Sequence, residues 1–216
     1  MSEFKFHAPD EYRKNAWVKT MDEYKEMYTR SIEKPDEFWA EMADQFYWEK
    51  RWDTVREYNF NISKGPVFIE WFKGGKTNIS YNCLDRHLKD RGDQTALIWE
   101  GNTEGEDLEI SYRQLHEKVC QFANALKSKG VGKGDRVAIY MGMVPEAAVA
   151  MLACARLGAI HSVVFGGFSA EALRDRVNDC EAEIVITQDV GRRGGRNIPL
   201  KAVTDEALVG NAYVQR

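Results

Sequence analysis

The chain has 216 residues, of which 44% are hydrophobic and 30% are charged, and its formal net charge at pH 7 is −4. This composition suits one moderate α/β domain with an appendage. A weakly negative chain has no overall attraction to nucleic acid or to an anionic membrane, so we expect neither partner, and any anion site must be local. The longest uncharged apolar run in the central part of the chain, Ala147–Ala155, is shorter than the ~20 residues that span a bilayer.

The four cysteines are far apart in the sequence and form no CxxC pair, which argues against a zinc site or a disulfide framework. We therefore expect reduced thiols and a cytoplasmic protein. The residues concerned are Cys83, Cys120, Cys154 and Cys180.

Residues 1–64 are rich in aromatic and charged side chains. Apolar residues recur at near-helical spacing from Tyr12 to Ile32, and Pro35 followed by two acidic residues is typical of the first turn of a helix. We predict two helices and an irregular tail. Aromatic rings could stack on bases, but that needs a basic groove, and here acidic and basic residues alternate. We expect instead that these large side chains cover a neighbouring domain.

The next stretch is predicted to hold a strand, a short helix and a hairpin around a Gly-rich acidic connection. Ser111, followed by Gln114 three residues later, forms a capping box that predicts a helix ending near Gly130 and covering one face of a sheet. The strand is expected at Val67–Phe72, the short helix at Asn82–Asp90, and the hairpin at Thr95–Glu100 and Leu108–Ile110.

The stretch from Asp135 to Arg196 organises the rest of the chain. It contains three short apolar runs rich in β-branched residues, separated by helical segments, which is the pattern of a parallel sheet. The runs are Val137–Met141, Ile160–Phe165 and Ile184–Thr187. We therefore predict the α/β class, with a helical aromatic-rich extension followed by an incomplete parallel βαβαβ sheet. Ligands bind outside the carboxyl ends of such strands, where two loops are expected.

The first of these loops is Gly166-Gly167, which follows a strand and precedes a helix capped by Ser169. Its backbone amides and the helix dipole together could hold a phosphate or a carboxylate. The pair completes neither a dinucleotide fingerprint nor a P-loop, and plain turn geometry explains it equally well.

The second loop, Gly191–Arg196, reads GRRGGR and places three guanidinium groups on a flexible backbone. Arginine forks match phosphate oxygens. On the residues alone, a solvated basic turn is the simpler interpretation, and a single copy without interleaved aromatics argues against an RNA contact.

No residue outside these two loops is a stronger candidate for a functional site. His161 lies within a predicted buried strand with no nucleophile beside it, so we interpret it as a core residue. The chain has no DxD, HExxH or GxSxG arrangement. We predict no catalytic residue and no metal site in these residues.

Several runs together resemble the amino-terminal part of the AMP-forming acetyl-coenzyme A synthetases (acetate–CoA ligases), members of the adenylate-forming superfamily. They are YNCLDRHL, GDRVAIYM, MVPEAAVAMLACARLGAIHSVVFGGFS, and IVIT followed by RGGR. The resemblance implies that residues 1–83 are that family's amino-terminal extension and that residues 84–216 begin its AMP-binding domain. In that family, acetate and Mg-ATP give acetyl-adenylate and pyrophosphate, and the thiol of coenzyme A then displaces AMP.

The resemblance also implies a ligand for the two loops. The RGGR loop would contact the phosphorylated adenosine end of coenzyme A, with the Gly-Gly turn alongside. The implied residues are Arg193, Gly194, Gly195, Arg196, Gly166 and Gly167. The sequence departs from the family at Gly142, where proline is usual, and at Gln188, Val190 and Arg192 near the RGGR loop.

The family's Ser/Thr/Gly-rich phosphate loop and catalytic lysine have no counterpart in residues 1–216, so its ATP and Mg²⁺ sites are not expected here. Three hypotheses stay open. The chain is part of an acetate–CoA ligase that acts only with a second chain carrying the remainder, a non-enzymatic coenzyme A-binding module, or a gene remnant with an unpaired sheet edge. Arg216 could be a natural end, a frameshift or an engineered boundary.

Overall fold

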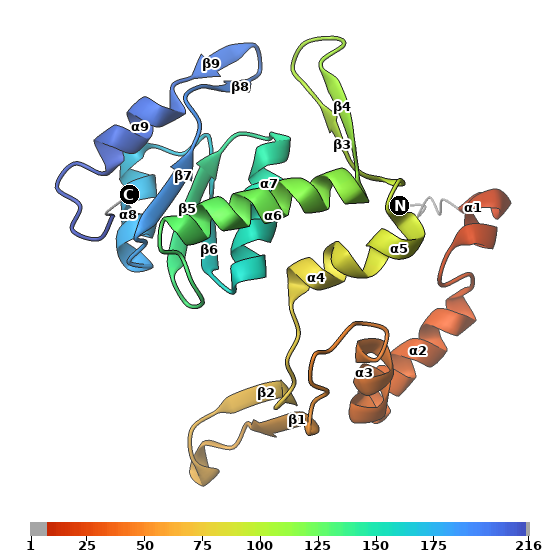
Figure 1. Ribbon diagram of the computed structural model, residues 1–216. Helices are drawn as coiled ribbons and strands as arrows, with labels where there is room; N and C mark the ends of the chain where they lie inside the picture. Colours follow the sequence, from red (N-terminus) through yellow and green to blue (C-terminus); the bar gives the residue numbers. More distant parts are fainter. Residues whose placement is uncertain (1–7, 215–216) are drawn as a thin grey trace, which may run out of the picture. The chain divides into compact units, whose positions relative to one another are not determined.

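The structure is a computed structural model that describes residues 8–214 (Figure 1). Arg216 therefore lies outside the described residues. The chain forms two compact units, Met1–Thr77 and Asn78–Arg216.

The first unit consists of helices and an antiparallel strand pair (Figure 1). Strands β1 and β2 pair with Thr54 opposite Lys73 and Asn59 opposite Phe68. The elements are α1 (Asp10–Asn15), α2 (Met21–Glu33), α3 (Pro35–Ala43), β1 (Thr54–Asn59), the 3-10 helix η1 (Ile62–Lys64) and β2 (Phe68–Lys73).

The prediction of two helices and an irregular tail in residues 1–64 was wrong. Within residues 8–64 lie three α-helices, the strand β1 and the 3-10 helix η1, and the apolar spacing from Tyr12 to Ile32 is broken between α1 and α2. Thr20 adopts extended backbone, and its side chain accepts the backbone N–H of Glu23 to start α2. This local cap begins a new helix because it satisfies N–H groups that a continuous helix would otherwise bond internally.

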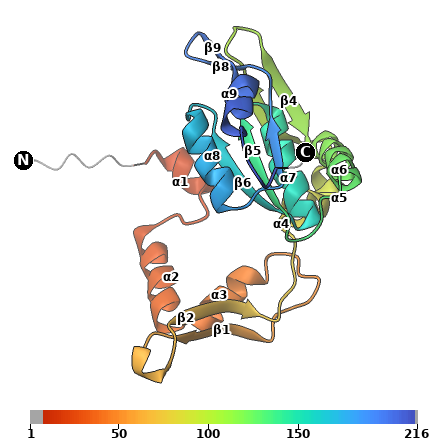
Figure 2. The same ribbon diagram turned by 90° about the vertical axis from the view of Figure 1, so that its left-hand side faces the viewer.

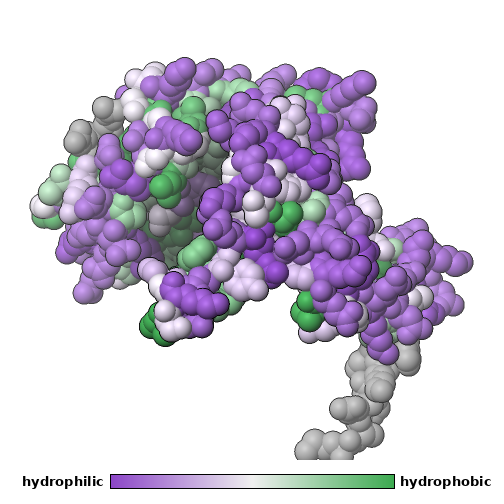
Figure 3. All heavy atoms as spheres, turned by 90° about the horizontal axis from the view of Figure 1, so that it is seen from below, coloured by the Kyte–Doolittle hydropathy of each residue, from purple (hydrophilic) through white to green (hydrophobic). Residues whose placement is uncertain are grey.

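Three aromatic rings form the centre of the first unit. The ring of Trp52 lies 4.9 Å from that of Trp48 and 5.0 Å from that of Phe72. Trp52 is buried, as are Phe38 and Ala43 of α3. Many other large apolar side chains of this unit are exposed. Figure 3 shows one face of the molecule, on which hydrophobic residues lie among hydrophilic ones.

The second unit begins with short helices, a hairpin and a long helix. The predicted helix over Asn82–Asp90 is instead divided, because α4 starts earlier, with the Asn78 side chain accepting the N–H of Tyr81, and ends before a 3-10 turn. The predicted hairpin and the capping box of Ser111 are confirmed. The elements are α4 (Ile79–Cys83), η2 (Asp85–His87), α5 (Leu88–Arg91), β3 (Thr95–Glu100), β4 (Asp107–Ser111) and α6 (Tyr112–Ser128).

A parallel three-stranded sheet of order β6-β5-β7 forms the centre of the second unit. The predicted βαβαβ pattern is confirmed, with Arg136 opposite Ile160 and Val137 opposite Ile184 in register. The elements are β5 (Arg136–Met141), α7 (Pro145–Leu157), β6 (Ile160–Phe165), α8 (Ala170–Asp179), β7 (Ile184–Thr187), β8 (Gly191–Arg193), β9 (Arg196–Ile198) and α9 (Leu200–Ala207).

Helices cover both faces of this sheet, with α6 and α7 on one side and α8 and α9 on the other (Figure 2). Alternate residues of β5 face opposite layers, as the pleat requires. Val137 and Ile139 pack in the layer with α6 and α7, while Ala138 and Tyr140 pack in the layer with α8 and α9. All four are fully buried, so β5 is the rigid centre of the unit.

Strand β6 is an edge of this sheet among residues 8–214. Its Ile160, Val163 and Phe165 side chains are 58%, 55% and 47% exposed. His161 is consequently half-buried rather than buried, which corrects the sequence-based interpretation. Within the described ranges, no helix combines the length and the apolarity needed to cross a bilayer.

Candidate functional site

A cavity of about 540 Å³ opens at the carboxyl ends of β5, β6 and β7. This is the edge at which parallel sheets bind ligands, because the loops there can supply backbone donors without disturbing the packed layers. Its walls come from the β3–β4 hairpin, the loop after β5, the turn after β6 and the segment from β7 to α9. The residues that carry its chemistry are Gly166, Gly167, Gln188, Arg192, Arg193 and Glu106.

Arg193 and the Gly-Gly turn meet in this cavity. A Cβ atom on Gly167 would lie 2.9 Å from Nη1 of Arg193 and 2.7 Å from the Phe165 ring, so only glycine allows this approach. The guanidinium carbon of Arg193 lies 4.7 Å from the centroid of the Phe165 ring, within cation–π range. The ring therefore holds the cation beside the backbone of the turn.

The GRRGGR segment is a β-hairpin, so the prediction of a flexible loop was wrong. Strands β8 and β9 pair antiparallel with Arg193 directly opposite Arg196. Gly194 and Gly195 have φ of 54° and 73°. Positive φ at both central residues gives the tight turn that matches strand twist, which explains the Gly-Gly sequence. Side chains at directly opposed positions lie on the same face of a strand pair, so Arg193 and Arg196 share one face.

The three arginines of the hairpin have different surroundings. Arg192 forms an ion pair with Glu106, with Nη1 and Oε1 3.5 Å apart, and its carbonyl accepts a hydrogen bond from Asn102. It thereby ties the hairpin to the β3–β4 hairpin. Arg193 and Arg196 are both exposed, but Arg193 lines the cavity and Arg196 does not. Among residues 8–214, neither Arg193 nor Arg196 forms an ion pair within 4 Å.

The turn after β6 is fixed by aromatic and hydrogen-bonded contacts. The Phe168 ring packs edge-on against Phe165, with centroids 5.7 Å apart, and the guanidinium of Arg176 lies over Phe168 at 4.7 Å. Tyr140, buried in β5, donates its hydroxyl to the carbonyl of Phe168 at 2.7 Å. Burial raises the pKa of this hydroxyl, which keeps it protonated as a donor.

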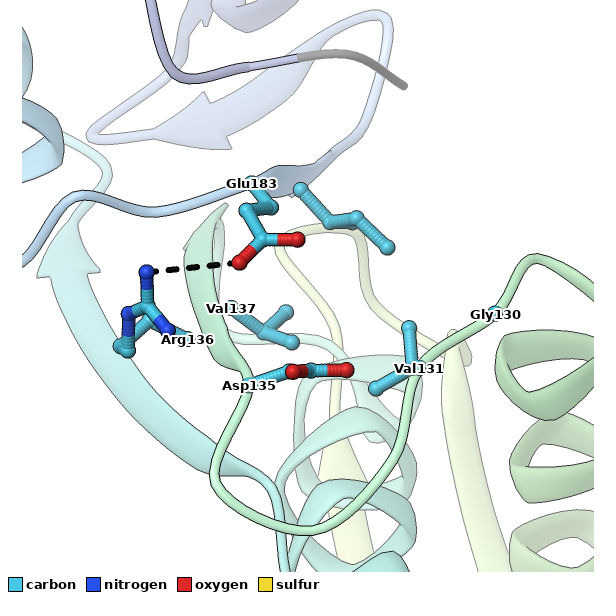
Figure 4. Close-up of a pocket in the computed structure, with 7 residues that line it drawn as sticks. Gly130, Val131, Asp135, Arg136, Val137 and Glu183 are labelled. Atoms are coloured by element: carbon cyan, nitrogen blue, oxygen red, sulfur yellow. Dashed lines mark ion pairs between the residues drawn. The ribbon is translucent and has the colours of Figure 1, made fainter.

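A second, small cavity of about 40 Å³ lies at the opposite, amino ends of β5 and β7 (Figure 4). Arg136 and Glu183 form an ion pair of 3.3 Å there, and Asp135 accepts the N–H of Gly132 at 2.8 Å. Arg136 also donates to the carbonyls of Cys180 and Glu181. A volume of this size holds a few water molecules at most. We interpret these contacts as structural.

A polar cluster between α6, α7 and η2 contains a cysteine, a histidine and an aspartate. Arg156 binds Asp85 with both Nη atoms, at 2.7 and 2.8 Å. The same nitrogen of His116, Nε2, lies 3.3 Å from Asp85 and 3.5 Å from Sγ of Cys120. A proton relay needs the two ring nitrogens to face different partners, so this cluster lacks the geometry of a nucleophilic triad.

Residues 8–214 contain no group of three or more His, Cys, Asp or Glu side chains placed to hold a metal ion.

Sequence reasoning missed several residues that shape the cavity. Phe165 and Phe168 flank the Gly-Gly pair in the run VVFGGFS, and this pattern was a usable signal for rings near the turn. The pairing of Arg192 with Glu106 carries no local signal, because the two residues come from hairpins far apart in the sequence.

Comparison with known proteins identifies two families along the chain. A family described as "AMP-binding enzyme" matches residues 84–212, which is more than half of the chain. A second, "Acetyl-coenzyme A synthetase N-terminus", matches residues 24–83.

Curated relatives cover nearly all of the chain. An acetyl-coenzyme A synthetase of Halorhodospira halophila is 57% identical over 212 residues, which are 97% of this chain and 32% of that protein. One of Syntrophus aciditrophicus is 50% identical over the whole chain and 33% of that protein. Acetyl-coenzyme A synthetase 2 of Pseudomonas aeruginosa is 53% identical over 96% of this chain and 32% of that protein. The chain thus spans about a third of the length of these relatives. It belongs to the AMP-binding enzyme family, and its residues 24–83 match the amino-terminal region of acetyl-coenzyme A synthetases.

Proposed function

We propose that this chain supplies part of the coenzyme A site of an AMP-forming acetate–CoA ligase, and that Arg193 and Arg196 bind the phosphorylated adenosine end. The observation that carries the proposal is the guanidinium of Arg193, held over Phe165 beside Gly167 at the rim of the cavity. Arg192 is occupied by Glu106, whereas the other two arginines share a hairpin face. Two such guanidinium groups suit the several oxygens of a phosphate monoester.

The reaction proposed for the whole enzyme has two steps. The carboxylate of acetate attacks the α-phosphorus of ATP and releases pyrophosphate, and the coenzyme A sulfur then attacks the acetyl carbon and expels AMP. The residues of this chain would act in the second step, by binding and orienting coenzyme A. Mg²⁺ would neutralise ATP phosphates, but residues 1–216 contain no Ser/Thr/Gly-rich phosphate loop to receive them.

We further propose that the family's extension ends at residue 83 and its AMP-binding domain starts at residue 84. The substrates of the whole enzyme would be acetate, ATP and coenzyme A, and its compartment the cytoplasm. A remainder of the enzyme, joined to these residues or carried by a second chain, would bind ATP and acetate. The open edge of β6, with Val163 and Phe165 exposed, supports further structure packing there.

Calorimetry with coenzyme A and with its dephospho form tests the phosphate contact. We expect coenzyme A to bind about tenfold more tightly, because charge-assisted hydrogen bonds to the 3′-phosphate are lost in the dephospho form. Arg193→Ala should reduce this preference. Arg91→Ala is the control, because it removes an exposed guanidinium outside the cavity lining and should retain the preference.

Equal affinity of the unaltered chain for the two ligands would contradict the role of the arginines. Circular dichroism of each variant checks that the fold is kept.

A second experiment addresses the whole reaction. The chain is mixed with a polypeptide carrying the remaining two thirds of a relative, and acetate-dependent release of pyrophosphate is measured. We expect release only from the mixture. A stable mixed complex that releases none would count against the ligase assignment.

A further inference from the structure

The side chain of Gln188 connects two walls of the cavity, the loop after β5 and the segment before β8. Its Oε1 accepts the backbone N–H of Gly142, in the loop after β5, at 2.8 Å. Its Nε2 donates to the carbonyl of Val190, in the segment before β8, also at 2.8 Å. All three residues line the cavity.

The chemistry of the contact suits a carboxamide. An N–H can only donate and a carbonyl can only accept, so the side chain between them must accept at one end and donate at the other. Leucine can do neither, and an ionised carboxylate can accept from Gly142 but would repel the carbonyl of Val190. Gly142 itself contributes an N–H, which proline lacks. Gly142, Gln188 and Val190, three of the four positions at which the sequence departs from the family's usual residues, are therefore joined by hydrogen bonds.

The Gly-Gly turn packs against the peptide of Gly142, so a shift of Gly142 would move the turn. A Cβ on Gly166 would lie 2.9 Å from the carbonyl oxygen of Met141 and 3.6 Å from the nitrogen of Gly142, so the turn packs directly on that peptide. The neighbouring Gly167 faces Arg193. On the other side, Val190 leads into β8, which carries Arg193. Gln188 is thus hydrogen-bonded to both segments that lead to Arg193, the loop at Gly142 and the segment at Val190.

We propose that Gln188 is a positioning residue: its carboxamide clamps Gly142 to Val190 and fixes the distance between the Gly-Gly turn and Arg193. The inference rests on the proposed function, because it assigns the clamp to the site that binds the phosphate of coenzyme A. Gln188 does not itself contact the reacting atoms; it acts through the two loops.

Three variants of the 216-residue chain test the clamp by calorimetry. Gln188→Leu removes both hydrogen bonds, and we expect it to bind coenzyme A about tenfold more weakly. Gln121→Leu makes the same chemical change on an exposed part of α6 outside the cavity lining and should bind like the unaltered chain. Gly142→Pro should weaken binding on its own but add little to Gln188→Leu, because both changes remove the same bond.

Gln188→Glu distinguishes positioning from general disruption. At pH 7.5 its carboxylate cannot donate to Val190, so binding should be weak. At pH 5 and below, the fraction that is protonated can accept from Gly142 and donate to Val190, as glutamine does. The affinity of this variant, divided by that of the unaltered chain at the same pH, should therefore rise as the pH falls. A ratio independent of pH would contradict the clamp.

Amide hydrogen exchange separates this inference from the proposed function. Exchange at Gly142 should be faster in Gln188→Leu than in the unaltered chain, with or without ligand. If the unaltered chain binds no coenzyme A, the proposed function fails, but faster exchange still supports the clamp. Unchanged exchange, or unchanged affinity in Gln188→Leu, would overturn it.

Discussion

The two units of the chain are stabilised in different ways. In the second unit, β5 lies between two apolar layers, and Ile139 and Tyr140 are fully buried on opposite faces of it. In the first unit, many large side chains are half-exposed and contact each other or a cation. The guanidinium of Arg56, for example, lies 4.7 Å from the Tyr58 ring and 5.6 Å from the Trp71 ring.

This difference shows that apolar content alone does not make a core. The first unit contains most of the tryptophans of the chain, yet Trp17 is 99% exposed and α2 has no buried residue. Its described helices do not cover both faces of a sheet, as α6 to α9 do in the second unit. The second unit provides the rigid frame on which the cavity loops are fixed. The expectation that the aromatics of the first unit cover a neighbouring domain stays a prediction.

The largest effect is expected from a buried side chain of β5. Ile139→Ala should lower the free energy of unfolding by about 3 kcal/mol, because it leaves a cavity between the sheet and α6 and α7. Trp17→Ala removes a larger but exposed side chain and should change it by less than about 0.5 kcal/mol. Urea denaturation followed by circular dichroism measures both. Similar losses in the two variants would contradict the contrast between the units.

An intermediate effect is expected from the ion pair of Asp85 with Arg156. Burial alone would raise the pKa of Asp85, but the hydrogen bonds and charge of Arg156 outweigh it, so the pKa is lowered. Asp85→Asn should cost about 2 kcal/mol at pH 7, since it leaves a partly buried guanidinium without its counter-charge. A lowered pKa stabilises the fold above the unfolded-state value near 4, and this contribution is lost as the pH falls through the folded-state value.

The difference between Asp85→Asn and the unaltered chain should therefore shrink below about pH 4. Asp205→Asn is the matched control. It breaks an exposed pair with Lys201 and should cost only a few tenths of a kcal/mol. A loss for Asp85→Asn that is the same at pH 3 and pH 7 would exclude the charge as its source.

The sheet of the second unit could be predicted from sequence because its signals are local and agree. β-branched runs, Pro145 at the start of α7 and Gly158 at its end all point to the same elements. The first unit could not be predicted as well. Its apolar spacing favours a continuous helix, whereas the Thr20 cap interrupts it. Strand β1 has no buried residue and lacks an apolar run.

The candidate site was only partly predictable for a related reason. Gly166, Gly167 and Arg193 were identified because glycine pairs and arginine clusters are visible in the sequence. Other contacts depend on loops that the sheet brings together. Arg192 pairs with Glu106, and Gln188 joins Gly142 to Val190. No spacing rule encodes such long-range contacts. The hairpin of GRRGGR, by contrast, was within reach, because Gly-Gly between two short runs is typical of a tight hairpin turn.

The smallest effect is expected from helix caps, of which each unit offers one of the same kind. Thr20 and Glu23 form a capping box in the first unit, as Ser111 and Gln114 do in the second. Ser111→Ala should lower the free energy of unfolding by about 1 kcal/mol, since α6 packs on the core, and Ser111→Asp should restore it. Thr20→Ala should reduce helix content locally and leave the cooperative transition unchanged, because α2 has no buried residue. Equal shifts of the cooperative transition in both alanine variants would mean that α2 unfolds together with the sheet, and the two units would then have to be treated as one.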